Sequence, residues 1–127
     1  MEDVYVEVEL ANYQDQVLAE HGYRDASNIR RERVPLRADT EATMLVLPPD
    51  LVQRLGLRIM DQKVIVTYAD ERKEERLMAG VLTIRVGERS METRCVVGPP
   101  LSEPLLGQIV LEQLDLFVNC AQGKLVP

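Results

Sequence analysis

The segment from residue 38 to residue 57 constrains the fold most, because a compact acidic turn runs directly into an apolar strand and a short helix. Ala-Asp-Thr-Glu-Ala-Thr opens the segment, and the apolar run Met-Leu-Val-Leu leads to Pro48. The residues from Pro49 to Leu55 have the spacing of a short helix, and Gly56 is placed to end it. We therefore expect an acidic side chain on a tight loop, held in place by the strand and helix that follow.

Strand-like alternation of apolar and polar residues dominates the rest of the chain. Strands are predicted over residues 3–10, 34–38, 62–69, 77–86 and 91–98, with short strands at 116–118 and 125–126, and helices over 13–21, 49–55 and 108–114. Pro35 favours an edge position for its strand. With four Tyr, one Phe and no Trp, the core must be aliphatic. The pattern lacks a βαβ rhythm and predicts a mainly β fold: a small closed β-barrel with two or three short helices, in a single domain spanning 1–127.

Charge and composition exclude several classes of function. The net charge of −6 argues against nucleic-acid binding, because phosphate contacts need a basic surface. No apolar run approaches the ~20 residues that a membrane-spanning helix needs, and residues 1–3 lack the features of a secretory signal. We therefore expect a cytoplasmic protein without a membrane partner. Cys95 and Cys120 are expected to be reduced thiols, with a disulfide or a reactive thiol as the alternative.

Three motifs in order carry a resemblance to a known family. The first is Asp39-Thr40-Glu41-Ala42-Thr43 with the strand that follows it, and the second is Tyr68-Ala69-Asp70-Glu71. The third is Pro104-Leu105-Leu106-Gly107. Together they resemble the acid loop, the flap tip and the apolar-apolar-Gly crossing of the retropepsin-like, single-lobe aspartic proteases, most nearly the small bacterial ones. The resemblance covers the chain from about residue 3 to its end.

The resemblance implies peptide-bond hydrolysis by two aspartates. A second acid motif is absent from the sequence, so the implied site is formed by a homodimer in which Asp39 faces Asp39 of a second copy across a two-fold axis. Two carboxyl groups ~3 Å apart cannot both ionise, so that one acts as a base on water while the other donates a proton. Thr40 would brace the two loops across the axis. The implied contacts with a polypeptide substrate come from Glu41, Ala42, Tyr68, Ala69, Asp70 and Glu71, within a flap over 68–78, and no cofactor or metal is implied.

Two departures from the family pattern bear on activity. Glu41 and Glu71 stand where the family has the glycine of Asp-Thr/Ser-Gly and the glycine of the flap tip. A glycine position can require backbone angles that other residues adopt at a cost of roughly 1–3 kcal/mol. Two copies of Glu41 beside two copies of Asp39 would also repel one another. These departures leave open an impaired protease and an inactive protein that keeps the fold.

Other interpretations remain at this point. A protease-like dimer could hold an extended peptide in its groove without cutting it. Residues 47–57 followed by 63–66 are similar to swapped-hairpin transcription factors of the antitoxin type, although the negative charge counts against DNA binding. Asp39 and Glu41, doubled by symmetry, could hold Mg²⁺ or Ca²⁺, or the acid loop could be an ordinary solvated turn. Residues 11–29 form an insert that could cover one end of the barrel or contribute to a dimer contact.

Overall fold

The structure is a computed structural model that describes residues 3–67, 70–119 and 121–127. Its strands are β1 (Val4–Asn12), β2 (Arg31–Ala38), β3 (Val46–Leu47), β4 (Arg58–Thr67), β5 (Lys73–Val86), β6 (Arg89–Val97), β7 (Leu105–Leu106), β8 (Phe117–Asn119) and β9 (Lys124–Val126). The helices are α1 (Tyr13–Glu20), the short 3₁₀ turn η1 (Ala26–Asn28), α2 (Pro49–Arg54) and α3 (Gln108–Gln113).

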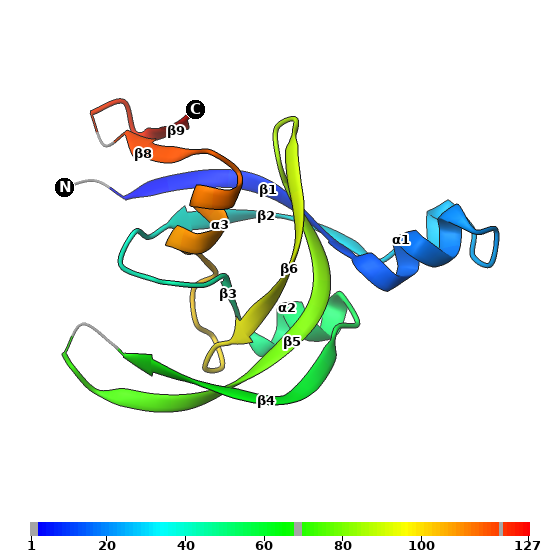
Figure 1. Cartoon of the computed structure of the whole chain (residues 1–127), viewed down its shortest axis with the longest axis horizontal. Coiled ribbons are helices and arrows are strands. Elements are labelled where there is room, and N and C mark those ends of the chain that lie inside the picture. The colour runs from blue at the N-terminus through cyan, green and yellow to red at the C-terminus, as the bar shows by residue number, and fades with distance from the viewer. Residues whose placement is uncertain (1–2, 68–69, 120) are drawn as a thin grey trace.

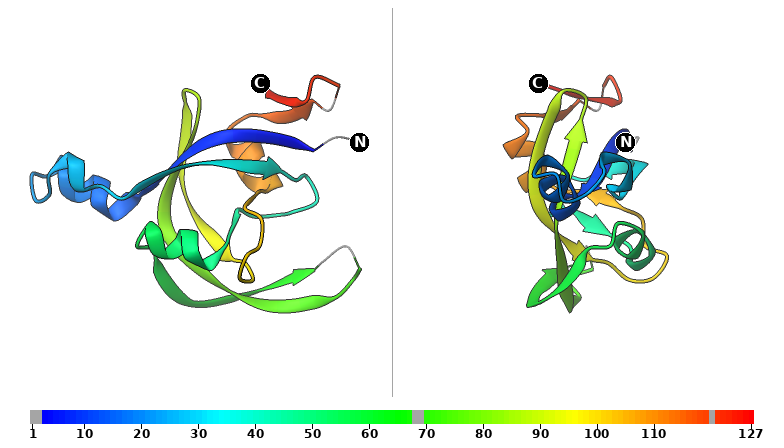
Figure 2. Two further views of the ribbon diagram at one scale, coloured as in Figure 1. Left: turned by 180° about the vertical axis from the view of Figure 1, so that it is seen from behind. Right: turned by 90° about the vertical axis from the view of Figure 1, so that its right-hand side faces the viewer.

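Seven strands form one sheet that curls into a closed ring. Their order is β1-β2-β7-β3-β6-β5-β4. β1 also pairs with the second half of β5, which closes the ring, while β4 pairs with the first half of the same strand. Neighbours are antiparallel except at β2–β7 and β3–β6, where they run parallel. Figures 1 and 2 show this ring, with β8 and β9 forming a separate two-stranded sheet beside the N-terminal end of β1. The predicted mainly β, closed architecture is confirmed.

The interior of the ring is aliphatic, as the shortage of aromatic residues requires. Alternate residues of the strands and the inner faces of α2 and α3 supply it. Its fully buried members include Leu10, Leu36, Leu45, Leu47, Leu51, Leu55, Leu82, Ile84, Leu106 and Leu111. Burying one leucine or isoleucine side chain stabilises the folded state by about 1.5–3 kcal/mol. This core therefore stabilises the packing of the ring of strands with α2 and α3.

One prediction about strand position was wrong. Pro35 was expected to mark an edge strand, but β2 lies between β1 and β7 in the sheet. Pro35 is tolerated there because β7 pairs only with the last two residues of β2, Arg37 and Ala38. Around Pro35, β2 has β1 as its single partner, with Pro35 opposite Glu7, so the missing proline N–H interrupts no ladder on the other side.

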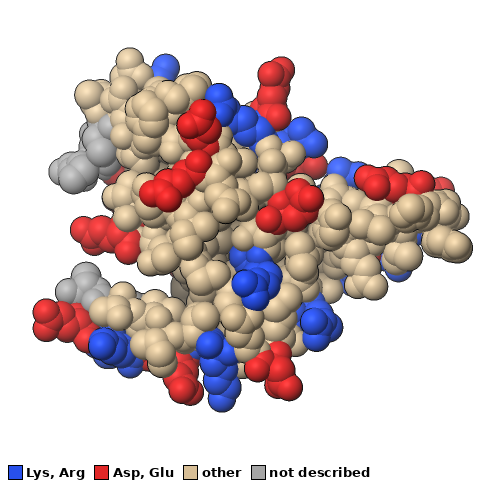
Figure 3. Space-filling model, viewed as in Figure 1, with Lys and Arg blue, Asp and Glu red and all other residues tan. Residues whose placement is uncertain are grey.

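Charged side chains of both signs are spread over the face of the molecule that Figure 3 presents, without a basic patch. Within the described residues no helix is long and apolar enough to cross a membrane.

The insert at residues 11–29 projects from the end of the molecule opposite the loop between β2 and β3 (Figure 1). It contains α1 and η1. α1 ends at Glu20, and Gly22 shortly after it has a φ of +78°, which suits glycine. The insert therefore lies away from the acid loop, at the far end of the ring. Its two alternative roles, covering one end of the barrel and contributing to a dimer contact, both stay predictions.

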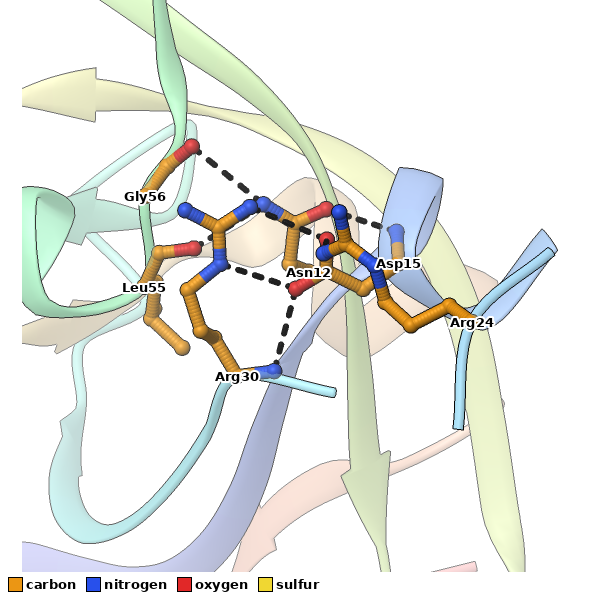
Figure 4. Close-up of polar contacts among 6 residues, drawn as sticks. All are labelled: Asn12, Asp15, Arg24, Arg30, Leu55 and Gly56. Atoms are coloured by element: carbon orange, nitrogen blue, oxygen red, sulfur yellow. Dashed lines mark hydrogen bonds and ion pairs between the residues drawn. The ribbon is translucent and has the colours of Figure 1, made fainter. Parts of the chain in front are cut away.

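A buried carboxylate fixes the base of the insert (Figure 4). The side chain of Asp15 on α1 is 1% exposed and forms ion pairs with Arg24 and with Arg30, whose Nε lies 2.8 Å from Oδ2. The backbone N–H of Arg30 donates to the same oxygen at 3.0 Å. Hydrogen bonds and the positive charge of Arg30 lower the pKa of Asp15 against the opposing effect of burial.

Asn12 connects this cluster to α2. Its side-chain amide donates to the carbonyls of Leu55 and Gly56, at 2.9 and 3.2 Å, and its oxygen accepts from the N–H of Asp15. Gly56 has φ +63°, and a Cβ there would collide with the guanidinium of Arg30. The backbone angle therefore favours glycine at this position, and any side chain there would have to displace the guanidinium of Arg30.

We predict that Asp15→Asn lowers the free energy of unfolding by about 2–3 kcal/mol, because it removes the buried charge on which two arginines and a backbone N–H converge. Urea titration at neutral pH measures the change. Glu20→Gln, an acid-to-amide change at an exposed position of the same helix, is the matched control and should stay within about 0.5 kcal/mol of the parent. Equal effects of the two substitutions would contradict this account of the cluster.

Candidate active site

The acid loop, residues Asp39–Thr43, begins directly after the last residue of β2. The N–H of Asp39 donates to the carbonyl of Leu106 at 3.0 Å, and its carbonyl accepts from Ala42 at 3.2 Å. The carboxylate folds back onto its own loop, where Oδ1 accepts from the N–H of Glu41 at 2.9 Å. These contacts make a tight turn that keeps one carboxylate oxygen against the loop, with 22% of the Asp39 side chain exposed.

The crossing segment, Pro104–Gly107, passes beneath this loop. Its β7 residues lie between β2 and β3, the strands that enter and leave the loop. Gly107 has no room for a side chain, because an added Cβ would collide with the carbonyl of Met44 and lie 2.7 Å from its N atom. Beyond the crossing, the N–H of Gln108 donates to Ala42 O at 2.8 Å. The loop is thus held from below by backbone contacts alone.

The β4–β5 hairpin lies across a hollow from the acid loop (Figures 1 and 3). At its turn, Oδ1 of Asp70 accepts from the N–H of Arg72 at 3.1 Å, and Glu71 adopts φ +65°. Tyr68 and Ala69 lie outside the described residues. The predicted site residues that the structure describes are therefore brought to two segments that face the same hollow, one on the loop and one on the hairpin.

Arg37 lies next to Asp39 on the side of the carboxylate that faces away from Glu41. Its Nη2 is 3.8 Å from Oδ2 of Asp39, and its Nε donates to Oε2 of Glu103 at 2.9 Å. The other oxygen of Glu103 accepts from the phenol of Tyr5 at 2.6 Å. The Tyr5 phenol and the Arg37 guanidinium together hold the pKa of Glu103 below its usual range.

Comparison with known proteins gives the family. A family model described as "gag-polyprotein putative aspartyl protease" matches residues 27–113, which include the acid loop, the hairpin and the crossing segment. The chain belongs to this aspartyl protease family. Among solved structures it is similar to "EIAV protease complexed with the inhibitor HBY-793", with a TM-score of 0.63, 16% identity and 93% of each chain covered. No curated protein sequence matched the chain. The retropepsin-like fold is thereby confirmed.

Within this aspartyl protease fold, the two glycine replacements differ in their backbone. Among the described residues, the non-glycine positions with positive φ are Glu71, Leu101 and Asp115. Glu71 therefore adopts the left-handed conformation that favours the family's glycine, whereas Glu41 does not. The expected cost of a strained backbone therefore applies to Glu71, whereas the same expectation was wrong for Glu41. Glu41 is exposed, and its backbone N–H still donates a hydrogen bond to Asp39.

The metal-site alternative needs Asp39 and Glu41 from two copies and stays a prediction, because the structure is that of a single chain. Across residues 3–67, 70–119 and 121–127, no three His, Cys, Asp or Glu side chains gather closely enough to hold a metal ion. Cys95 is a buried free thiol whose pKa is raised to about 12 by burial, which makes it a poor nucleophile at neutral pH. Cys120 lies outside the described residues.

Sequence reasoning missed Arg37 beside Asp39, and Glu103 and Tyr5, which lie behind Arg37. The signal for Arg37 was present, because positions i and i+2 of a strand face the same side and β2 runs to Ala38. Tyr5 and Glu103 carried no such signal, since they come from segments 98 residues apart in the sequence. Their contact exists only once the barrel has closed.

Proposed function

We propose that the protein is a homodimeric aspartic endopeptidase homologue in which Asp39 of each of two copies forms one shared site. The observation that carries the proposal is the acid loop itself. Asp39 keeps its backbone N–H partner and its crossing segment although Glu41 replaces the motif glycine. One such loop per chain supplies one carboxyl group, and the family's reaction needs two, so a second copy is required.

The chemistry follows from placing two carboxyl groups in one site. A pair ~3 Å apart shares a proton, so that one group takes a proton from water while the other gives one to the carbonyl oxygen of the scissile peptide. In this proposal Thr40, which is exposed on the loop, contacts the partner loop across the axis. The β4–β5 hairpin closes over the extended substrate and excludes water from it. Glu41, also exposed, turns away from the axis and so avoids the repulsion of four carboxylates.

The direct experiment is cleavage of an unfolded protein substrate from about pH 3.5 to about pH 7, the range in which carboxyl pairs work. We expect cleavage that is favoured by acid and abolished by Asp39→Asn, with both proteins sedimenting at twice the chain mass of 14.4 kDa. Asp50→Asn, at an exposed acid on α2, is the matched control and should leave cleavage intact. A monomer, or cleavage that survives Asp39→Asn, would contradict the proposal.

A second candidate is a dimer that holds an extended peptide in the groove without cutting it. The observation in its favour is Glu71, which places a side chain and a charge on the turn of the hairpin at φ +65°. Closure over a substrate has to fix the turn in one conformation, and fixing Glu71 at positive φ costs about 1–3 kcal/mol more than fixing a glycine there.

We therefore expect that a substitution in the hairpin, rather than one in the acid loop, increases the protease activity. We predict that Glu71→Gly raises kcat/KM for peptide cleavage several-fold, up to about tenfold, because the cost is relieved in the closed, substrate-bound hairpin and ~1.4 kcal/mol there corresponds to a factor of ten. Glu41→Gly should change it by no more than about twofold, since Glu41 is not in a glycine-favouring conformation. The opposite ranking, measured under identical conditions, would show that the acid loop limits the activity.

A further inference from the structure

The carboxylate of Asp39 is held from both sides. Oδ1 accepts from the Glu41 N–H at 2.9 Å, and Oδ2 lies 3.8 Å from Nη2 of Arg37. An aspartate carboxyl group rotates readily about its last torsion, because that torsion has only broad preferences. One hydrogen bond leaves the second oxygen free to move, so the arginine completes the orientation of the group.

Arg37 is itself fixed by partners from other parts of the chain. Its Nε donates to Glu103 at 2.9 Å, its backbone N–H donates to Pro104 O at 3.3 Å, and its Nη1 lies 3.9 Å from Asp3. Glu103 in turn accepts from the phenol of Tyr5. The side chain of Arg37 is 26% exposed, so these partners restrict a guanidinium that is largely enclosed.

We propose that Arg37 is a positioning residue for Asp39, and that Glu103 and Tyr5 hold the guanidinium in the orientation this requires. The catalytic consequence rests on the proposed function, because it concerns the carboxyl group that would act on water. Displacing a reacting group by about 1 Å can cost about 100-fold in rate. A fixed arginine beside the carboxylate prevents such a displacement.

Arg37 could instead attract an acidic side chain of the substrate, but its contacts fit this role less well. Three carboxylates, those of Asp3, Asp39 and Glu103, already lie within 4 Å of the Arg37 guanidinium. Hydrogen bonding to Glu103 and the charges of these neighbours raise the pKa of Arg37, which accordingly stays charged. Its charge is thus balanced by neighbours within the chain, and little of it remains to attract a substrate.

The test compares Arg37→Leu with Arg33→Leu. Arg33 is an arginine on the same strand whose side chain is 69% exposed and pairs with Glu9, so both substitutions remove one positive charge from β2. For Asp39-dependent cleavage we expect Arg37→Leu to lower kcat by up to about 100-fold with KM within about twofold. Arg33→Leu should leave both parameters unchanged. A rise in KM at unchanged kcat would assign Arg37 to substrate binding and overturn the proposal.

Two further variants test the contacts that hold Arg37. Tyr5→Phe removes one hydrogen bond to Glu103 and should lower kcat less than Arg37→Leu does. Arg37→Lys should recover part of the loss, since an ammonium keeps the charge but cannot bind Glu103 and Asp39 through one planar fork. Full recovery by lysine would show that the charge alone acts, which contradicts positioning.

A measurement without turnover separates this proposal from the proposed function. The ¹³Cγ resonance of Asp39 at pH 7 should shift in Arg37→Leu and stay in place in Arg33→Leu, because the first loses the partner of Oδ2. If the parent protein cleaves no substrate, the proposed function fails and this measurement alone decides the positioning role. An Asp39 resonance that is unchanged in Arg37→Leu would overturn it.

Discussion

The acid loop depends on the close approach of two backbone segments at Gly107. Any side chain there would collide with Met44, and the crossing segment could then no longer lie between β2 and β3. Without that position, the N–H of Asp39 would lose its partner at Leu106 and the N–H of Gln108 would lose its acceptor in the loop. Local sequence alone therefore does not shape the loop: a segment more than 60 residues downstream holds it.

Polar contacts position the functional parts of a barrel that an aliphatic core holds together. At one end, Asp15 gathers two arginines, and Asn12 beside it ties the base of the insert to the end of α2. At the other, Arg37 and Glu103 join the end of β2 to the loop before the crossing segment. A buried or partly buried charge is costly unless it is paired, and in both places the pairing partners come from separate segments. Each network thereby makes the position of one segment depend on another.

Much of the fold could be predicted from the sequence, because alternation marks the long strands and Gly22 and Gly56 mark helix ends. The apolar run before Pro48 predicted β3, but β7 could not be identified by alternation, since two residues are too few to show a period. The resemblance placed the acid loop and its crossing correctly. It could not show which glycine replacement would adopt positive φ, because that depends on the geometry of each turn. The burial of Asp15 could not be predicted from the sequence, because it depends on Arg24 and Arg30 folding back onto α1.

The central claim is that one active site needs Asp39 from two chains. Mixing the parent protein with an equal amount of Asp39→Asn protein, under conditions in which subunits exchange, tests this most directly. If both carboxyl groups are needed, about one quarter of the dimers are competent, and cleavage falls to about one quarter of that of the parent protein at the same total concentration. Cleavage at about one half would mean that each chain acts with its own Asp39 alone, and would contradict the shared site.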